Sequence, residues 1–465
     1  MGSYGKLQDL MNYEKEFGLW LEKESVAELS RANKPHGKNF VGERPYPHFD
    51  NKIGIKQLQN KKNKLRQEII DSDKLAQHSF WPLIRRDQLK RQYKKGDDKK
   101  KESKMKNRPI MFASHHDSCI YAFFASLLRE KYESRILNTS LNDSVIGYRR
   151  IPISQNLQTN KSNIDFANEI FRTIKTRDNF AVICLDIKGF FDSMNHRKIR
   201  DSICDILDVG ELPKSFKIVL CVIMKYRYIS YSRKLNKIIS SRKVSDSLHE
   251  AIGKNEIAIL KNKYARGIPQ GSPISDILAN IYLYNFDKKM TEKISAWGGA
   301  LYRRYSDDIL LLVPLNKAKE IYEYARAEIE KEKVKIGKDK TEIYKISLAD
   351  NKIFDITSQY ESGYKKNRKR IQYLGFEFDL QNIIERPGTV EKNYRRAKKI
   401  TKSMEYKATN AKNLGKKLQK SDKPNLFAYQ GLSSKKHRNA GFNKQYDKIK
   451  KKSLKITKSK RKEVL

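Results

Sequence analysis

Tyr305-Ser306-Asp307-Asp308 is the stretch that decides the fold, because it sets two adjacent carboxylates between two apolar runs. The runs Ala300–Tyr302 and Ile309–Val313 predict two buried strands. The Asp pair then falls at the bend of a hairpin. Unpaired carboxylates beside a hydrophobic core are costly, and a divalent cation is the usual remedy. Taken alone, however, Asp-Asp is also ordinary turn chemistry.

A further carboxylate has the same setting. Residues 180–185 are apolar with a β-branched bias and predict a buried strand that ends at Asp186. Ser193 is the predicted N-cap of a helix from Met194 to Leu207. Asp186 and the Asp pair together give three carboxylates, which can bind two Mg²⁺ ions and clamp both oxygens of an in-line displacement. Viewed alone, Asp186 also suits a helix cap or a turn.

Between these segments lies a turn-rich loop, Arg266–Pro273, which leads into a predicted helix over Ile274–Lys289. Gly271 lets the backbone approach a ligand closely. Gln270 can donate a hydrogen bond to a base or a sugar. A plain Gly/Pro loop before a helix remains the alternative.

In this order the three segments resemble motifs A, B and C of reverse transcriptases, carried by Asp186–Phe191, Gly267–Pro273 and Tyr305–Asp308. The resemblance extends, with falling specificity, over about residues 80–385. Four further segments resemble motif D, the primer grip of motif E and two fingers motifs; they are Lys340-Thr341, Gln372–Phe376, Arg108-Pro109-Ile110 and Tyr148-Arg149.

Within the family, the sequences of these motifs are similar to those of bacterial reverse transcriptases of the defence-associated and abortive-infection group. The resemblance implies an α+β, right-hand polymerase fold, with an antiparallel palm sheet backed by helices and a helical, basic thumb. The implied regions are an N-terminal extension (1–75), fingers (76–180), palm (181–385, with an insert at about 208–265) and thumb with tail (386–465).

The resemblance also assigns roles at the reaction centre. Asp186 and Asp307 would bridge two Mg²⁺ ions, with Mn²⁺ as a substitute, while Asp308 and the carbonyl of Ile187 complete the shell. Arg108 would neutralise the incoming triphosphate. Lys340 is a candidate acid for the leaving group, and its alternative is a solvated lysine among Lys335, Lys338 and Lys345.

Other residues would select the nucleotide and hold the primer. The resemblance makes Phe191 an aromatic gate against a ribose 2′-hydroxyl, beside Phe190, Gln270 and Gly271 in the nucleotide site. A core aromatic is the alternative for Phe191. Asp192 is interpreted as a helix-start residue, although RNA-dependent RNA polymerases carry a second Asp shortly after the first. The primer grip comprises Tyr373, Leu374 and Gly375.

Bulk properties support a nucleic-acid partner. The 465 residues include 98 Lys and Arg against 54 Asp and Glu, a net charge of +44. Such an excess predicts a polyanionic ligand and salt-dependent affinity. No apolar run approaches the length of a membrane span, and Met1–Leu10 lacks a signal-peptide core. The four cysteines (Cys119, Cys184, Cys204 and Cys221) suit reduced, buried thiols in a cytoplasmic protein.

Several segments carry weaker expectations. Two helices, Leu7–Glu28 and Ile55–Ile70, are predicted in the N-terminal extension, which falls outside the clear resemblance and is a candidate RNA or partner site. Lys94–Arg108 is predicted to be a solvated hairpin tip, and Ser230–Glu256 a polar insert. His196 and the cluster His115-His116-Asp117 lack metal-ligand spacing and are interpreted as structural.

The predicted function is an RNA-directed DNA polymerase with dNTP substrates, an RNA template and a DNA product or primer. A dedicated non-coding RNA is the expected template, and bacterial antiphage defence the expected setting. Two alternatives stay open: untemplated or protein-primed DNA synthesis, and an RNA-binding scaffold without essential catalysis. The sequence leaves the priming hydroxyl and the oligomeric state undetermined.

Overall fold

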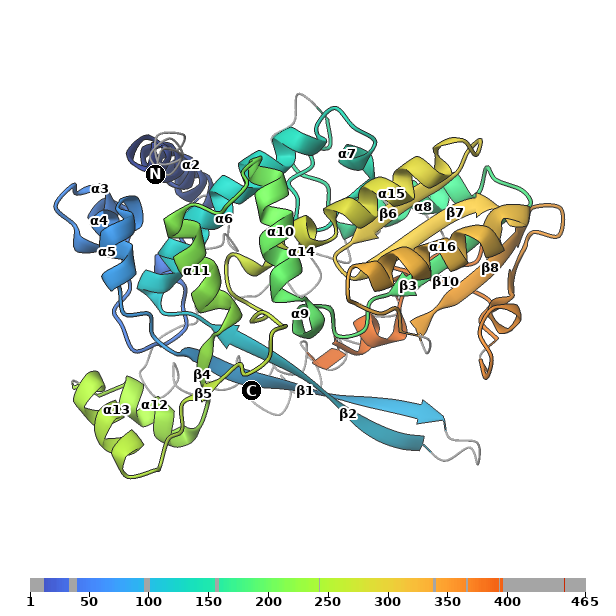
Figure 1. Cartoon of the computed structure of the whole chain (residues 1–465). Coiled ribbons are helices and arrows are strands. Elements are labelled where there is room, and N and C mark those ends of the chain that lie inside the picture. The colour runs from blue at the N-terminus through green and yellow to red at the C-terminus, as the bar shows by residue number, and fades with distance from the viewer. Residues whose placement is uncertain are drawn as a thin grey trace.

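The sheet that carries the Asp pair has five antiparallel strands in the order β6-β7-β3-β8-β9 (Figure 1). The computed structural model describes residues 12–32, 40–95, 101–154, 159–241, 243–337, 340–364, 367–392, 394–395 and 447. The predicted strands before Asp186 and around Asp307 are confirmed. The five strands are β3 (Phe180–Asp186), β6 (Leu301–Tyr305), β7 (Asp308–Pro314), β8 (Glu342–Ser347) and β9 (Lys352–Asp355).

The central strands are apolar throughout because each face of the sheet packs against a hydrophobic core. Ile183 and Leu311 point into the larger core. Val182 and Leu310 point into a second core on the opposite face. The larger core is completed by α10 (His196–Leu207), α14 (Ser275–Tyr282), α15 (Tyr284–Ser295) and α16 (Ala318–Lys331), and the second by α8 (Asn163–Ile174), β10 (Ile371–Tyr373), β11 (Phe376–Phe378) and β12 (Ile383–Glu385).

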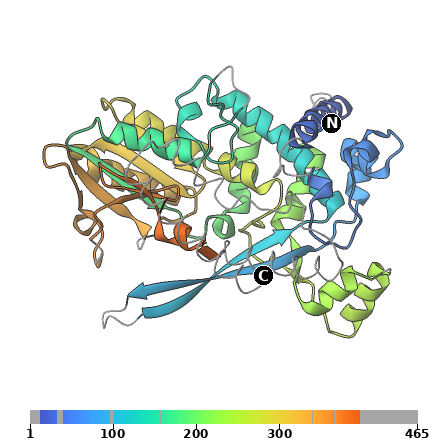
Figure 2. The same cartoon turned by 180° about the vertical axis from the view of Figure 1, so that it is seen from behind.

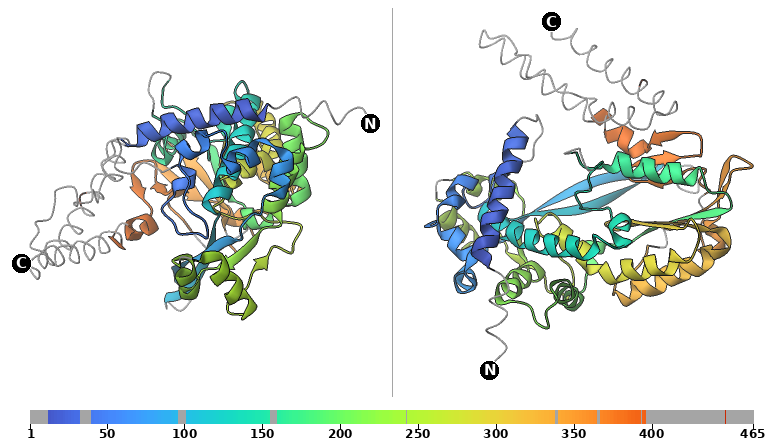
Figure 3. Two further views of the ribbon diagram at one scale, coloured as in Figure 1. Left: turned by 90° about the vertical axis from the view of Figure 1, so that its left-hand side faces the viewer. Right: turned by 90° about the horizontal axis from the view of Figure 1, so that it is seen from above.

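The N-terminal segment belongs to the larger core and is not an appendage. Helix α2 (Tyr13–Ala32) lies beside α6 (His115–Ile136) (Figure 3), and the rings of Phe17 and Phe123 are 5.6 Å apart. The predicted helix Ile55–Ile70 is divided into α3 (Ile55–Gln59) and α4 (Lys64–Ile70). The other elements on this side are η1 (Val41–Glu43), α5 (Ser72–Gln77) and α11 (Lys214–Met224), whereas α7 (Leu141–Ser144) lies beside α15 and β6.

A long hairpin reaches out beneath the palm sheet (Figures 1 and 2). It consists of β1 (Leu83–Lys95) and β2 (Lys101–Phe112), so most of the predicted tip Lys94–Arg108 is strand. Its base joins β4 (Arg227–Ser230) and β5 (Leu260–Lys261) in a sheet of order β2-β1-β4-β5. The predicted polar insert contains α12 (Arg233–Ile239) and α13 (Val244–Gly253), which pack into a third core around Leu235 and Leu248.

The structure corrects three local predictions and confirms the α+β class. Asn195, not Ser193, caps α10 by accepting from the Lys198 backbone N–H at 3.2 Å, because residues Phe190–Ser193 form a separate short helix, α9. The predicted helix Ile274–Lys289 is two helices, α14 and α15, which meet at Leu283. All four cysteines are free, but Cys221 is exposed. The predicted thumb lies almost entirely outside the described residues. The remaining short helices are η2 (Leu315–Lys317) and η4 (Thr357–Gln359).

Candidate active site

The three predicted carboxylates meet at one end of the palm sheet. In the β3–β7 register Asp186 lies opposite Asp308, and in the β6–β7 register Tyr305 lies opposite Asp308. The backbone N–H of Ile187 donates to the carbonyl of Asp307 at 3.1 Å, which fixes the strand end against the turn. Ser306 adopts a left-handed conformation, φ +60°, that closes the hairpin.

These carboxylates line a cavity of about 730 Å³, called here the carboxylate cavity. The hairpin β1–β2 supplies Arg108 to its wall, the end of β10 supplies Tyr373, and the turn after it supplies Leu374. Positively charged side chains line the same cavity: Lys106, Arg108, Lys340, Arg368 and Arg386. A cavity with both signs of charge can hold an anionic ligand on its basic wall and a cation on its acidic wall.

The carboxylates repel one another. Asp308 borders the open cavity, but desolvation by the surrounding protein, followed by the charges of Asp307 and Asp186, raises its pKa to about 7. Burial also raises the pKa of Asp186 above its ordinary value, although the ammonium of Lys340 partly offsets this. Lys340 forms an ion pair with a carboxylate oxygen of Asp186. Lys340, proposed from sequence as an acid, thus lies beside the predicted carboxylates in the same cavity.

The donor set has the chemistry of a divalent cation site, since hard oxygen ligands suit Mg²⁺ and a cation would relieve the mutual repulsion. The three carboxylates border one cavity without converging on a single point, however. In the described ranges, no three His, Cys, Asp or Glu side chains form a group that could hold a metal ion. The ammonium of Lys340 already neutralises one of the three acids, Asp186.

The residues predicted to bind the nucleotide divide between two cavities. Arg108 lines the carboxylate cavity. Phe191, Gln270 and Gly271 line a second cavity of about 900 Å³, the loop cavity, together with Tyr305 of β6. Phe190 lies in the larger core, 3% exposed, and lines neither cavity.

A neighbouring backbone segment leaves no room for a side chain at position 271, so this position requires glycine. Its φ is +114°, and a Cβ there would approach the carbonyl oxygen of Met111 to 2.8 Å. The carbonyl of Gln270 accepts from the Met111 N–H at 2.8 Å, so this loop is tied to β2. The residues predicted to grip the primer lie at the end of β10 (Tyr373) and in the tight turn to β11, with positive φ at Leu374 and Gly375.

A buried polar network that the sequence reasoning missed supports the turn. Arg304, on β6, donates to both oxygens of Asp287 at 2.7 and 2.6 Å, and both side chains are 0% exposed. Another nitrogen of Arg304 donates to the carbonyl of Ser306 at 3.1 Å. Burial alone would lower the pKa of Arg304, but the Asp287 carboxylate outweighs it and raises that pKa. The available signal was a charged residue at an inward position of a strand.

The loop before α8 completes this support. Gly147 packs so closely that a Cβ would meet the Ser306 backbone nitrogen at 2.6 Å. Asn280 of α14 donates to the Gly147 carbonyl at 2.9 Å, and the hydroxyls of Tyr148 and Ser306 are 3.3 Å apart. The turn that bears Asp307 is therefore held from three directions.

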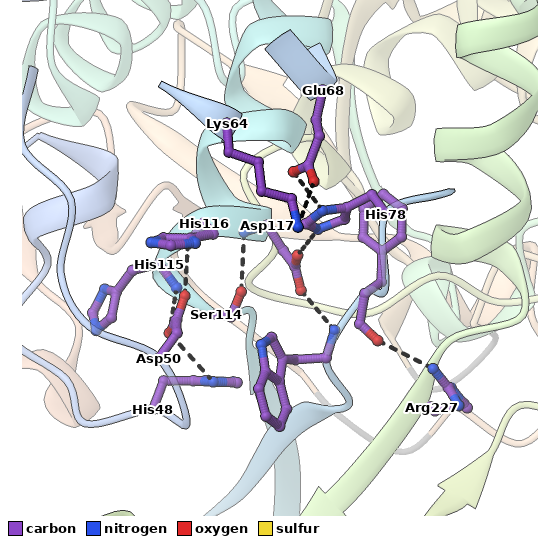
Figure 4. A network of polar contacts seen from close by, with 12 residues as sticks. His48, Asp50, Lys64, Glu68, His78, Ser114, His115, His116, Asp117 and Arg227 are labelled. Atoms are coloured by element: carbon purple, nitrogen blue, oxygen red, sulfur yellow. Dashed lines mark hydrogen bonds and ion pairs between the residues drawn. The ribbon is translucent and has the colours of Figure 1, made fainter. Parts of the chain in front are cut away.

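None of the described histidines lines the carboxylate cavity, and several have protein partners, as Figure 4 shows for His48, His78, His115 and His116. His78 bridges Glu68 and Asp117, with 2.8 Å contacts on both sides. Asp50 accepts from the backbone N–H groups of His115 and His116. His196 contacts the carbonyl of Gly267 at 2.8 Å. These contacts support the structural interpretation made from the sequence.

Comparison with known proteins gives one family match. Residues 230–378 match the family described as reverse transcriptase (RNA-dependent DNA polymerase). This stretch contains Gln270, Asp307, Asp308 and Lys340 but begins after Asp186. This stretch is therefore similar to a reverse transcriptase domain. Domains of this family generally use divalent metal ions and act on RNA and DNA.

Solved structures of telomerase are also similar. The apo telomerase of Candida tropicalis truncated from its C-terminal domain is 11% identical, with 70% of this chain and 60% of that chain covered and a TM-score of 0.40. Telomerase of Candida albicans in complex with a TWJ fragment of telomeric RNA is 13% identical, with coverage of 68% and 49% and a TM-score of 0.39. This chain thus spans about half to three fifths of their length. No curated protein matches the sequence.

The helices were also assessed for membrane insertion. Within the described ranges, none combines the length and the apolar character that a bilayer span needs.

Proposed function

We propose that this chain adds dNTPs to a primer 3′-hydroxyl on an RNA template by two-metal phosphoryl transfer. One observation carries most of the proposal: the register of β3 with β7 pairs Asp186, which lies outside the matched family segment, with Asp308 inside it. The acids therefore come from two separate strands and share one cavity with Arg108 and Lys340. Acids on separate strands with cationic groups opposite suit an in-line displacement at a phosphate.

The metal ligands would be Asp186, Asp307, Asp308 and the carbonyl of Ile187, for two Mg²⁺ ions with Mn²⁺ as a substitute. Such ions lower the pKa of an attacking hydroxyl and stabilise the charge on departing pyrophosphate. Arg108 neutralises the triphosphate from the β2 side of the carboxylate cavity. Lys340 donates a proton to the leaving group once its ammonium is released from Asp186.

Nucleotide choice is proposed to rest on the loop cavity. Phe191 is 9% exposed and borders the loop that holds Gln270. A ring at this place excludes a ribose 2′-hydroxyl and so favours dNTPs over NTPs. Tyr373 and Leu374, which line the carboxylate cavity, and the adjacent Gly375 position the primer end.

The resemblance to defence-associated bacterial enzymes extends the proposal to a dedicated non-coding RNA as template, and to antiphage defence in the cytoplasm. This extension is tested by purifying the chain from its host and sequencing the RNA and DNA that it retains. Recovery of one abundant structured RNA with complementary DNA supports it. Random cellular RNA without complementary DNA counts against it.

The polymerase activity itself is tested by extension of a labelled DNA primer on an RNA template with dNTPs and Mg²⁺. Asp307→Asn should abolish extension, whereas Asp246→Asn, an exposed change on α13, should not. Extension that persists in Asp307→Asn would refute the assignment. Products formed without template would favour untemplated synthesis, and label attached to protein would favour protein priming. Intact biological function in Asp307→Asn would instead favour an RNA-binding scaffold.

A further inference from the structure

The segment Ile259–Arg266 exposes apolar side chains just before the loop that carries Gln270. Tyr264 is 69% exposed, the highest value among the exposed large hydrophobic residues of the described chain, and Leu260 and Ile259 are 44% and 41% exposed. Residues Leu260 and Lys261 form β5, the edge strand of the sheet β2-β1-β4-β5. The side chains of Ile259–Arg266 are called here the Tyr264 surface.

The exposed ring is held by a well-ordered backbone framework. The side-chain amide of Asn262 donates to the carbonyls of Met224 and Arg266, both at 2.9 Å, and its oxygen accepts from the Tyr264 N–H at 3.2 Å. The Asn262 N–H also donates to the carbonyl of Tyr226 at 2.9 Å. On the other side, the carbonyl of Ala265 accepts from the His196 N–H at 3.1 Å. The tyrosine is therefore presented on a fixed turn.

Charge on this surface has one sign. Lys261, Lys263 and Arg266 are exposed, and no acid occurs between Ile257 and Arg266. Within the ranges that the structure describes, none of these three side chains forms an ion pair, while the preceding acid, Glu256, is paired with Lys234. The Arg266 guanidinium instead lies 5.7 Å from the centroid of the Tyr264 ring. This leaves three positive charges around an exposed aromatic ring.

We propose that the Tyr264 surface binds a single-stranded segment of nucleic acid, with a base stacked on Tyr264 and the phosphates on Lys261, Lys263 and Arg266. Aromatic rings interleaved with unpaired cations are how proteins hold single strands without reading their sequence. A duplex offers no free base face to an exposed ring, so the single strand is the better match. The exposed apolar side chains are interspersed in sequence with Lys261, Lys263 and Arg266, which suits a polyanion better than an apolar protein surface.

The place of this surface in the fold gives the strand a role. The Gly267 N–H donates to the carbonyl of Met194 at 2.8 Å and the Ile268 N–H to that of Phe191 at 2.9 Å, so the Tyr264 surface runs directly into the wall of the loop cavity. Strands β4 and β5 lie at the base of the long hairpin, away from α15 and α16 (Figure 1). The inference rests on the proposed function, because the single strand is the unpaired part of the substrate that this polymerase copies.

The test measures affinity for a fluorescent oligouridine by anisotropy over a range of salt concentrations. Tyr264→Ala should weaken binding about 5- to 150-fold, the range for loss of one stacked base, and Tyr264→Phe should retain it. Lys261→Ser with Lys263→Ser should lower the slope of log affinity against log salt by about 1.4. The matched control, Lys288→Ser with Lys319→Ser on α15 and α16, changes two exposed lysines elsewhere and should leave that slope unchanged.

The outcomes separate this inference from the proposed function. If the wild-type chain extends primers but Tyr264→Ala binds the oligonucleotide as tightly as wild type, the inference is overturned and the polymerase assignment stands. If the chain extends no primer yet oligonucleotide binding depends on Tyr264, the polymerase assignment is overturned and the inference stands. A change in self-association with unaltered oligonucleotide affinity would mark a protein interface and also overturn the inference.

Discussion

Replacing Asp287 by Asn removes one charge from the buried pair that supports the Ser306-Asp307 turn, with little change in side-chain volume. Asp287 and Arg304 are both 0% exposed, and two hydrogen bonds of 2.7 and 2.6 Å join them. Without the carboxylate, the guanidinium stays buried and uncompensated. Breaking a buried pair in this way costs about 3–5 kcal/mol, a large part of the roughly 5–15 kcal/mol by which domains are stable.

Urea denaturation followed by tryptophan fluorescence measures this loss in free energy of unfolding. Lys254→Ala breaks an exposed ion pair with Glu250 and serves as the control, with an unchanged midpoint expected. A loss below about 1 kcal/mol for Asp287→Asn would refute the reasoning, because so small a loss is typical of a solvated ion pair and not of a buried one.

A second variant separates stability from catalysis. Asp287→Leu with Arg304→Met replaces both charges by apolar groups, which should restore most of the stability lost by either single change. Activity should not return, because the carbonyl of Ser306 then lacks the donor that holds it at 3.1 Å. If primer extension recovered together with stability, Arg304 would have no part in holding the turn.

Three further changes have defined outcomes. Phe191→Val should lower the preference for dNTPs over NTPs on the order of ten-fold or more, measured as the ratio of kcat/KM values; unchanged selectivity would make Phe191 a core residue only. Lys340→Met should slow extension yet raise Mn²⁺ affinity about two- to five-fold, measured by calorimetry; lower affinity would contradict competition for Asp186. Burial lowers the pKa of His48 to about 4, so the folded state loses stability as the pH falls from about 6.5 to 4, by about 3 kcal/mol in total. His48→Asn should flatten that pH dependence in denaturation experiments, and an unchanged acid limb would assign it to other groups.

Local chemistry made the centre of this fold predictable. The runs Phe180–Asp186 and Ile309–Val313 are apolar because both faces of their sheet are covered, and such runs are visible without any partner. The register that pairs Asp186 with Asp308 could only be inferred through the resemblance, since these residues are far apart in sequence. Local errors arose where two capping residues competed, as with Ser193 and Asn195.

Contacts between distant residues set the limit of prediction. Arg304 and Asp287 each look like ordinary surface charges in sequence, and only the packing of β6 against α15 buries both. Likewise, the segment before residue 75 carried no motif, yet Phe17 and Trp20 belong to the larger core. The hydrogen bonds of Asn262 that present Tyr264 also reach residues on other elements.

Lys340 affects both the charge balance among the three carboxylates and the proton transfer that is proposed there. Three carboxylates at one end of a buried sheet would repel one another strongly, and the ammonium on Asp186 reduces that repulsion. A ligand cation on Asp186 would compete with this ammonium, because both are attracted to the same carboxylate. Release of Lys340 into the cavity would then make a proton donor available in the cavity that Arg108 and Arg386 also line, where the triphosphate is proposed to bind. Lys340 can thus neutralise Asp186 when no substrate is bound and act on the leaving group when substrate is bound. This requires that Lys340 does not pair with Asp186 while the cation is bound there.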